Sequence, residues 1–149
     1  MIAYLDSSAV VKRYVEEDGS EVVRSMYRKA YNGGAVLALS AWNFGEVLGV
    51  LDRYHRRGWL AESDYAKALR SFASETIRLV RLGVMRVVPV RASLLAASWS
   101  IALRHHVHQA DALQIVSAKR AGADVLLTGD ERLSEVASSE GLKSVYLEG

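Results

Sequence analysis

The sequence predicts an α/β domain, a three-layer α/β/α sandwich with a mainly parallel sheet. Short apolar runs without polar alternation, such as Val125 to Leu127, are typical of strands buried on both faces of a parallel sheet. Longer segments between them repeat apolar residues at the spacing of amphipathic helices. Because strands and helices alternate from end to end, parallel strands with helices on both faces are favoured. We expect one domain over residues 1–149.

Strands are expected at residues 2–5, 35–39, 84–90, 125–128 and 144–147. Helices are expected at residues 7–18, 20–31, 41–57, 62–82, 93–106, 108–120 and 131–140. Ser7 or Ser8, Ser20 and Ser40 are placed as N-caps, and glycines follow most of the helices. Pro89 lies at the end of the third strand, which favours an edge position because proline lacks a backbone donor.

The helix at 62–82 has one apolar stripe, which we interpret as core. The stripe consists of Tyr65, Leu69, Phe72, Thr76 and Val80. Glu75 and the basic residues of this helix are expected largely outside it. A stripe that extended beyond one face would indicate a dimer or partner surface.

Composition narrows the class of protein. Half of the 149 residues are apolar and 24% are charged, which indicates a globular domain. There are no cysteines, which excludes disulfides and thiolate metal sites and favours a cytoplasmic location. No apolar run is long enough to span a membrane, and no signal peptide is recognisable. The net charge of +2 and the pI near 9.0 are compatible with nucleic acid as a partner.

Four acidic residues are expected to meet at one edge of the sheet. Asp6 and Asp130 each follow a buried strand, and ligands of parallel α/β sheets bind outside those strand ends. Glu46 and Asp111 lie on largely apolar sides of their helices, where a lone carboxylate would be costly. Taken singly, each acid could be a cap, a turn residue or a surface charge. Together they indicate a shared metal site.

The chemistry of such a cluster favours a hard cation. Two carboxylates ~5 Å apart repel by roughly 3 kcal/mol at an effective dielectric near 20. Oxygen ligands suit Mg²⁺ or Mn²⁺, and a cation held in this way can promote phosphodiester hydrolysis. Ser7 and Thr128 adjoin the acids and could hydrogen-bond a ligating carboxylate or a water; the alternative is that both are ordinary caps.

Four short motifs together resemble one family. Asp6-Ser7-Ser8-Ala9 follows the first strand, Ser40 to Glu46 opens a helix, and Asp111-Ala112-Leu113 and Thr128-Gly129-Asp130 follow in that order. Over a domain of this size they look like a PIN-domain ribonuclease, most similar to the VapC toxins of type II toxin–antitoxin modules.

This resemblance implies a Mg²⁺- or Mn²⁺-dependent endoribonuclease that cuts single-stranded or loop RNA and leaves a 5′-phosphate and a 3′-hydroxyl. It makes Asp6, Glu46, Asp111 and Asp130 the catalytic, metal-binding acids. It also implies a homodimer and a VapB-like antitoxin that lays a helix in a groove and reaches the acids. Many relatives have a further acid soon after the one matching Asp130, where this chain has only Glu131, so the number of cations stays open.

Other interpretations remain. His105, His106 and His108 could bind zinc with Asp111, but the spacing matches no zinc pattern. The arginines at the end of the helix that contains Glu46 could contact RNA phosphates or could form a solvated helix end. They are Arg53, Arg56 and Arg57. Tryptophans could stack bases, although scattered tryptophans are usually core or interface. They are Trp42, Trp59 and Trp99.

Rival classes fit less well. An aspartyl-phosphate hydrolase needs a second Asp two positions after the nucleophile, where Ser8 stands, and a receiver domain needs a lysine after a late strand. The remaining alternatives are an RNA-binding or RNA-processing PIN module without a toxin role, and a catalytically inactive relative.

Overall fold

A computed structural model describes residues 1–148. Its strands are β1 (Ile2–Leu5), β2 (Val36–Ser40), β3 (Met85–Val88), β4 (Val125–Thr128) and β5 (Ser144–Tyr146). Its helices are α1 (Ser7–Tyr14), α2 (Ser20–Tyr31), α3 (Trp42–Arg56), α4 (Glu62–Arg81), α5 (Ala92–His105), α6 (Gln109–Arg120) and α7 (Glu131–Ser139). In this part of the chain no helix combines the length and the apolar character that crossing a membrane requires.

The five strands form one sheet in the order β3-β2-β1-β4-β5, and all four neighbouring pairs are parallel. The three central strands are almost wholly buried, as their continuous apolar runs predict. Strand β3 is an edge strand and ends just before Pro89, so the predicted edge position is confirmed.

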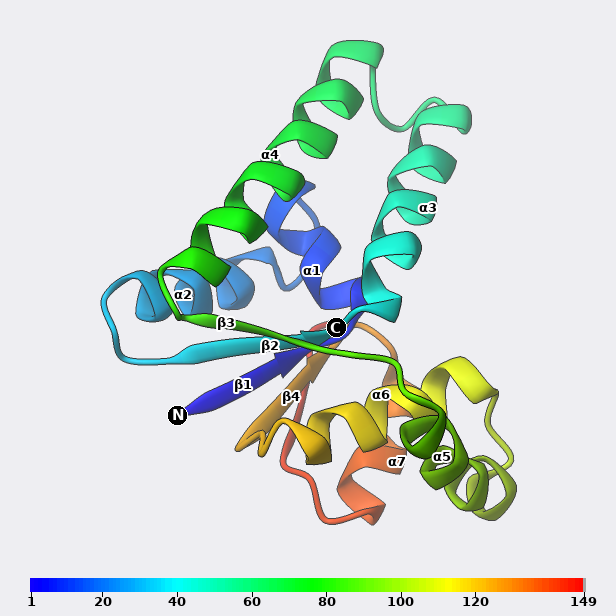
Figure 1. Cartoon of the computed structure of the whole chain (residues 1–149). Helices are drawn as coiled ribbons and strands as arrows, with labels where there is room; N and C mark the ends of the chain where they lie inside the picture. Colours follow the sequence, from blue (N-terminus) through cyan, green and yellow to red (C-terminus); the bar gives the residue numbers. More distant parts are fainter. Residues whose placement is uncertain (149) are drawn as a thin grey trace.

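Helices cover both faces of the sheet, which confirms the three-layer sandwich (Figure 1). One face packs against α1, α2, α3 and α4, with Leu5, Leu37 and Leu127 in the shared core. The other face packs against α5, α6 and α7, with Tyr4 and Leu126 in a second core. Alternate residues of β1 and β4 therefore belong to opposite cores, as the two-residue period of a strand requires.

Several local predictions are corrected. Asp6, and neither Ser7 nor Ser8, is the N-cap of α1, with its carboxylate accepting from the Ala9 N–H. Helix α1 ends at Tyr14, four residues before the predicted end at 18. Ser40 is the last residue of β2 and does not occupy the N-cap position of α3, which is Ala41. The Ser40 side chain still accepts a hydrogen bond from the Trp42 N–H at 3.1 Å.

The buried side of α4 is also rotated from the predicted stripe. Phe72 and Thr76 are buried, whereas Val80 is 44% exposed. Glu75, expected outside the stripe, is buried, and its carboxylate receives two hydrogen bonds from the Arg13 guanidinium at 2.9 Å. A charged residue takes a core-facing position here because a cation from another helix meets it there.

Candidate functional site

Asp6 lies where β1 ends, and its carboxylate is held on both sides. The register pairs Leu5 with Leu127, which brings Asp6 beside Thr128. Oδ1 of Asp6 accepts from the Ala9 N–H at 2.9 Å and from the Ser8 hydroxyl at 2.6 Å. Oδ2 accepts from the Thr128 hydroxyl at 2.5 Å. Each oxygen has two lone pairs, so Oδ2 retains capacity for a further partner.

Burial dominates the electrostatics of this carboxylate. Asp6 is only 5% exposed, and burial raises its pKa to about 6 against the opposing effect of its hydrogen bonds. The negative charge of Asp130 raises the pKa further. An acid that is costly to ionise in the metal-free protein is a group that a nearby cation would stabilise.

The β4–α7 loop connects Asp130 to the same network. The Thr128 hydroxyl accepts from the Asp130 N–H at 3.0 Å while donating to Asp6. The Gly129 N–H donates to the Ser8 hydroxyl at 2.7 Å. Asp130 itself caps α7, with Oδ1 accepting from the Leu133 N–H at 3.2 Å. Thr128 thus bonds the carboxylate of one acid and the backbone of another, which confirms that its hydroxyl contacts the acids.

Glu46 enters from the first half of α3. Its Oε1 accepts from the Ser7 hydroxyl at 2.9 Å and from the Asn43 side-chain amide at 3.2 Å. No hydrogen bond from residues 1–148 reaches Oε2. Ser7 therefore links the start of α1 to Glu46, and the contact predicted for its hydroxyl is present.

Asp111 lies in the first turn of α6, on the other face of the sheet, and is partly buried. Burial raises its pKa, and the charges of Asp130 and Glu46 add to that effect while His108 opposes it. These Coulombic effects link acids from α3, α6 and the β4–α7 loop. Asp6 joins the same group through Asp130.

The donor set fits a hard divalent cation in its chemistry. All four candidates offer carboxylate oxygens, which Mg²⁺ and Mn²⁺ prefer. As placed, however, residues 1–148 contain no group of three or more His, Asp or Glu side chains that could hold a metal ion. The fit therefore rests on the type of ligand and on the mutual repulsion of the acids.

A buried lysine beside this loop does not neutralise the acids. Lys12 is 2% exposed, and its ammonium lies 2.6 Å from Glu148 Oε1 and 3.2 Å from Glu17 Oε1. A side-chain carbon added at Gly129 would lie 3.2 Å from Cε of Lys12, so the lysine stem packs against the loop. Its charge is thus already matched by two carboxylates outside the acid group.

Other sequence candidates lie further from the acids. Arg53, Arg56 and Arg57 are exposed at the far end of α3, where Arg56 binds Asp52 and Arg57 lies over the Trp59 ring. All three tryptophans are exposed, so a core role is excluded for each of them.

The three histidines of the possible zinc cluster have different structural roles. His105 binds Glu140 through Nε2 at 2.7 Å, His106 is the C-cap that follows α5, and His108 is the N-cap of α6. His105 is therefore engaged with a carboxylate that is not among the predicted zinc ligands.

Sequence reasoning missed three polar residues that contact or support the acids: Ser8, Asn43 and Gln114. The sequence offers Ser8 as a helix cap and as part of the first motif, without a contact to an acid. The signal for Asn43 was its position three residues before Glu46 on the same helical face. For Gln114 the corresponding signal was its position three residues after Asp111.

The sequence and the fold are similar to those of known proteins. The PIN domain family model matches residues 3–139. No curated protein matches the sequence. Among solved structures, the chain is similar to PAE2754 from Pyrobaculum aerophilum, at a TM-score of 0.67 and 19% identity over 97% of this chain and 84% of that one.

Two further structures are similar in fold. The sarcin–ricin-loop-cleaving toxin VapC20 of Mycobacterium tuberculosis matches at a TM-score of 0.64 and 18% identity, covering 97% of this chain and 98% of that one. A chain of VapBC2 from Rickettsia felis, bound to a DNA fragment from its promoter, matches at 0.64 and 13%, covering 99% and 100%. The family model spans nearly all of the sequence, and we conclude that the chain belongs to the PIN domain family.

Proposed function

We propose that this PIN domain is a Mg²⁺- or Mn²⁺-dependent endoribonuclease, with Asp6, Glu46, Asp111 and Asp130 as its catalytic, metal-binding acids. The observation that supports it best is electrostatic. Asp130 raises the pKa of both Asp6 and Asp111, and Glu46 raises that of Asp111. Four carboxylates from separate elements therefore act on one another at the carboxyl edge of the sheet, where ligands of parallel α/β sheets bind.

The residues of the chain would prepare the site as follows. Ser8, Thr128 and the Ala9 N–H fix the carboxylate of Asp6. Ser7 restrains one oxygen of Glu46. A bound Mg²⁺ or Mn²⁺ supplies charge compensation for the phosphodiester and for the oxygen that leaves it. Water attacks phosphorus, the P–O3′ bond breaks, and the products carry a 5′-phosphate and a 3′-hydroxyl.

The RNA would extend from the acids along α3. Arg53 lies seven residues beyond Glu46, or ~10 Å along a helix axis. Its exposed guanidinium could therefore bind a phosphate near the scissile one without entering the acid group.

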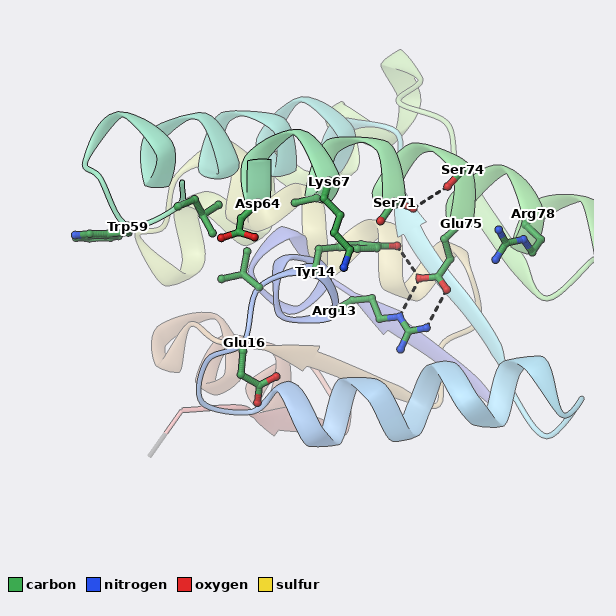
Figure 2. A pocket seen from close by; sticks show the side chains of 13 residues that line it. Arg13, Tyr14, Glu16, Trp59, Asp64, Lys67, Ser71, Ser74, Glu75 and Arg78 are labelled. Atoms are coloured by element: carbon green, nitrogen blue, oxygen red, sulfur yellow. Dashed lines mark hydrogen bonds and ion pairs between the residues drawn. The ribbon is translucent and has the colours of Figure 1, made fainter. Parts of the chain in front are cut away.

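We further propose that the domain is the toxin of a toxin–antitoxin pair, on the basis of its similarity in fold to VapC20 and VapBC2. A groove of about 650 Å³, lined largely by charged and polar side chains, offers a place for the polar face of an antitoxin helix. Figure 2 shows Arg13 and Tyr14 of α1 at its base, next to Glu75 of α4, and Lys67 extending from α4 across it. Helix α1 starts at the acids and ends at this groove, so a bound segment could continue toward Asp6. We propose a homodimer as well, because the resemblance to VapC toxins implies one, and light scattering of the purified chain tests this proposal.

Cleavage of labelled single-stranded RNA tests the enzyme. We expect Mn²⁺ to support cleavage and EDTA to stop it, and Asp111→Asn to be inactive with an unchanged circular dichroism spectrum. Cleavage that persists in EDTA or in Asp111→Asn would refute the metal-acid site. Binding of RNA without cleavage would favour the alternative, an RNA-binding or inactive PIN module without a toxin role.

A further inference from the structure

Three buried polar side chains from three elements meet beneath the acids; we name them the Tyr4–Asn43–Gln114 joint. Tyr4 belongs to β1, Asn43 to α3 and Gln114 to α6, and each is at most 3% exposed. The Tyr4 hydroxyl donates to Gln114 Oε1 at 2.7 Å, and the Asn43 amide donates to the same oxygen at 3.0 Å. The joint therefore spans the sheet and both helical layers.

The orientation of the Asn43 amide is settled by a backbone donor. The Ser40 N–H donates to Asn43 Oδ1 at 2.8 Å, so the oxygen must face Ser40 and the NH₂ group must face the other way. That NH₂ group then donates to both Glu46 Oε1 and Gln114 Oε1. Asn43 is thus the one member of the joint that touches an acid.

Each member of the joint lies close in sequence to a different acid. Tyr4 precedes Asp6 by two residues, Asn43 precedes Glu46 by three, and Gln114 follows Asp111 by three. Residues three apart on a helix share a face, so the joint fixes the rotation and height of α3 and α6 where their acids begin. Asp130 is tied instead through Thr128 and Asp6.

A gain in folding stability does not explain why these three polar residues are buried together. Because Gln114 Oε1 must face Asn43, its NH₂ group points away, and Nε2 finds no acceptor among residues 1–148 although it is buried. Such an unpaired group destabilises a core, and apolar side chains of the same shape would avoid the loss. Burial also raises the pKa of the Tyr4 hydroxyl far above its usual value, so this donor stays protonated.

We propose that Asn43, held by Gln114 and Tyr4, is a positioning residue that orients the Glu46 carboxylate for divalent cation binding. Asn43 and Ser7 both bind Oε1, which restrains the carboxylate and leaves Oε2 without a hydrogen bond from residues 1–148. Gln114 acts through Asn43 and has no contact with Glu46. This inference rests on the proposed metal site.

Calorimetric titration of the full chain with Mn²⁺ alone tests the positioning role of Asn43. Partners of metal ligands typically change metal affinity by 10- to 100-fold when removed. We expect Asn43→Ala to weaken Mn²⁺ binding by about 10-fold or more, and Gln114→Met by a smaller factor. Because Gln114 acts through Asn43, the double variant should bind Mn²⁺ as Asn43→Ala does. Ile115→Val is the control, since it loosens the core beside Gln114 without touching the joint.

The outcomes separate the two proposals. Binding by Asn43→Ala within twofold of wild type, single effects that multiply in the double variant, or an equal loss in Ile115→Val would each overturn the positioning role. A wild-type chain that does not bind Mn²⁺ would overturn the proposed function and this inference with it. Urea unfolding in EDTA checks each variant. If Asn43→Ala is unfolded, Asn43→Ser takes its place, because its hydroxyl can still accept from the Ser40 N–H.

Discussion

Replacing Asp6 by asparagine should stabilise the metal-free protein. Burial raises the pKa of Asp6 from 3.8 to about 6, a difference of about two units. At 1.36 kcal/mol per unit, keeping this carboxylate ionised at neutral pH costs the folded state up to ~3 kcal/mol. Asparagine removes the charge, and its oxygen can still accept from the Ala9 N–H and cap α1.

The sign of the pH dependence follows from the raised pKa. The folded state binds the Asp6 proton more tightly than the unfolded state does, so wild-type stability falls as pH rises from about 4 to about 6. The advantage of Asp6→Asn should be full at pH 7.5 and should vanish near pH 4. Mg²⁺ should stabilise wild type, because a ligand that binds only the folded state adds to its stability, and should do so much less in the variant.

Urea unfolding in EDTA at pH 7.5 and pH 4, repeated with Mg²⁺, measures both effects. Asp18→Asn is the matched control, since it removes one exposed carboxylate outside the acid group. If Asp6→Asn unfolds at lower urea than wild type in EDTA at pH 7.5, then Asp6 serves as a structural cap, and the reasoning from repulsion and burial is refuted.

Two further predictions concern single side chains away from the acids. Arg53→Ala should weaken RNA binding and should reduce the slope of log affinity against log salt concentration by about 0.7, the value for one phosphate contact on a single strand. Arg70→Ala, which removes an exposed arginine on α4, should change neither quantity. Fluorescence anisotropy at several salt concentrations measures the slope, and an unchanged slope in Arg53→Ala would exclude the contact. Glu140→Gln should lower the free energy of unfolding by about 1 to 3 kcal/mol at pH 7, because hydrogen bonds from His105, Arg104 and Lys119 lower the pKa of Glu140 to about 2. The partly exposed side chains of these partners reduce the effect. The stability that ionised Glu140 contributes is fully present above pH ~4.5 and declines toward pH 2. Urea unfolding should therefore show a smaller stability difference between Glu140→Gln and wild type at pH 2.5 than at pH 7. An equal difference at both pH values would contradict this role of Glu140.

The fold could be predicted from local patterns wherever burial is continuous. Residues 2–5 and 125–128 form β1 and β4 with the predicted bounds, because an apolar run buried on both faces leaves little ambiguity. Strand β3 is shorter than predicted and ends at Val88, before Pro89. Apolar residues beyond a strand end lengthen the apolar run in the sequence, but they do not join the hydrogen-bonded pairing of the sheet.

Pairings between distant residues could not be predicted. The inward position of Glu75 depends on Arg13, which lies 62 residues away. Similarly, Asn43 meets Gln114 across 71 residues. Periodicity assigns a residue to a face, but it does not say which polar groups will find partners there. The four acids could be proposed as a group because strand ends and helix faces are local features, whereas the groups that hydrogen-bond them come from tertiary packing.

Helices α3 and α4 rise together away from the sheet and meet at a tip near Trp59 (Figure 1). If α3 turned as a rigid body about the buried side chain of Asn43, its far end and Glu46 would move together. A helix of this length is ~22 Å long, so a push of ~4 Å at the tip would turn it by ~10° and carry Glu46 by ~1 Å. Displacements of that size can slow a reaction a hundredfold. Under the proposed function, a protein bound at the tip would therefore disturb the acids without covering them.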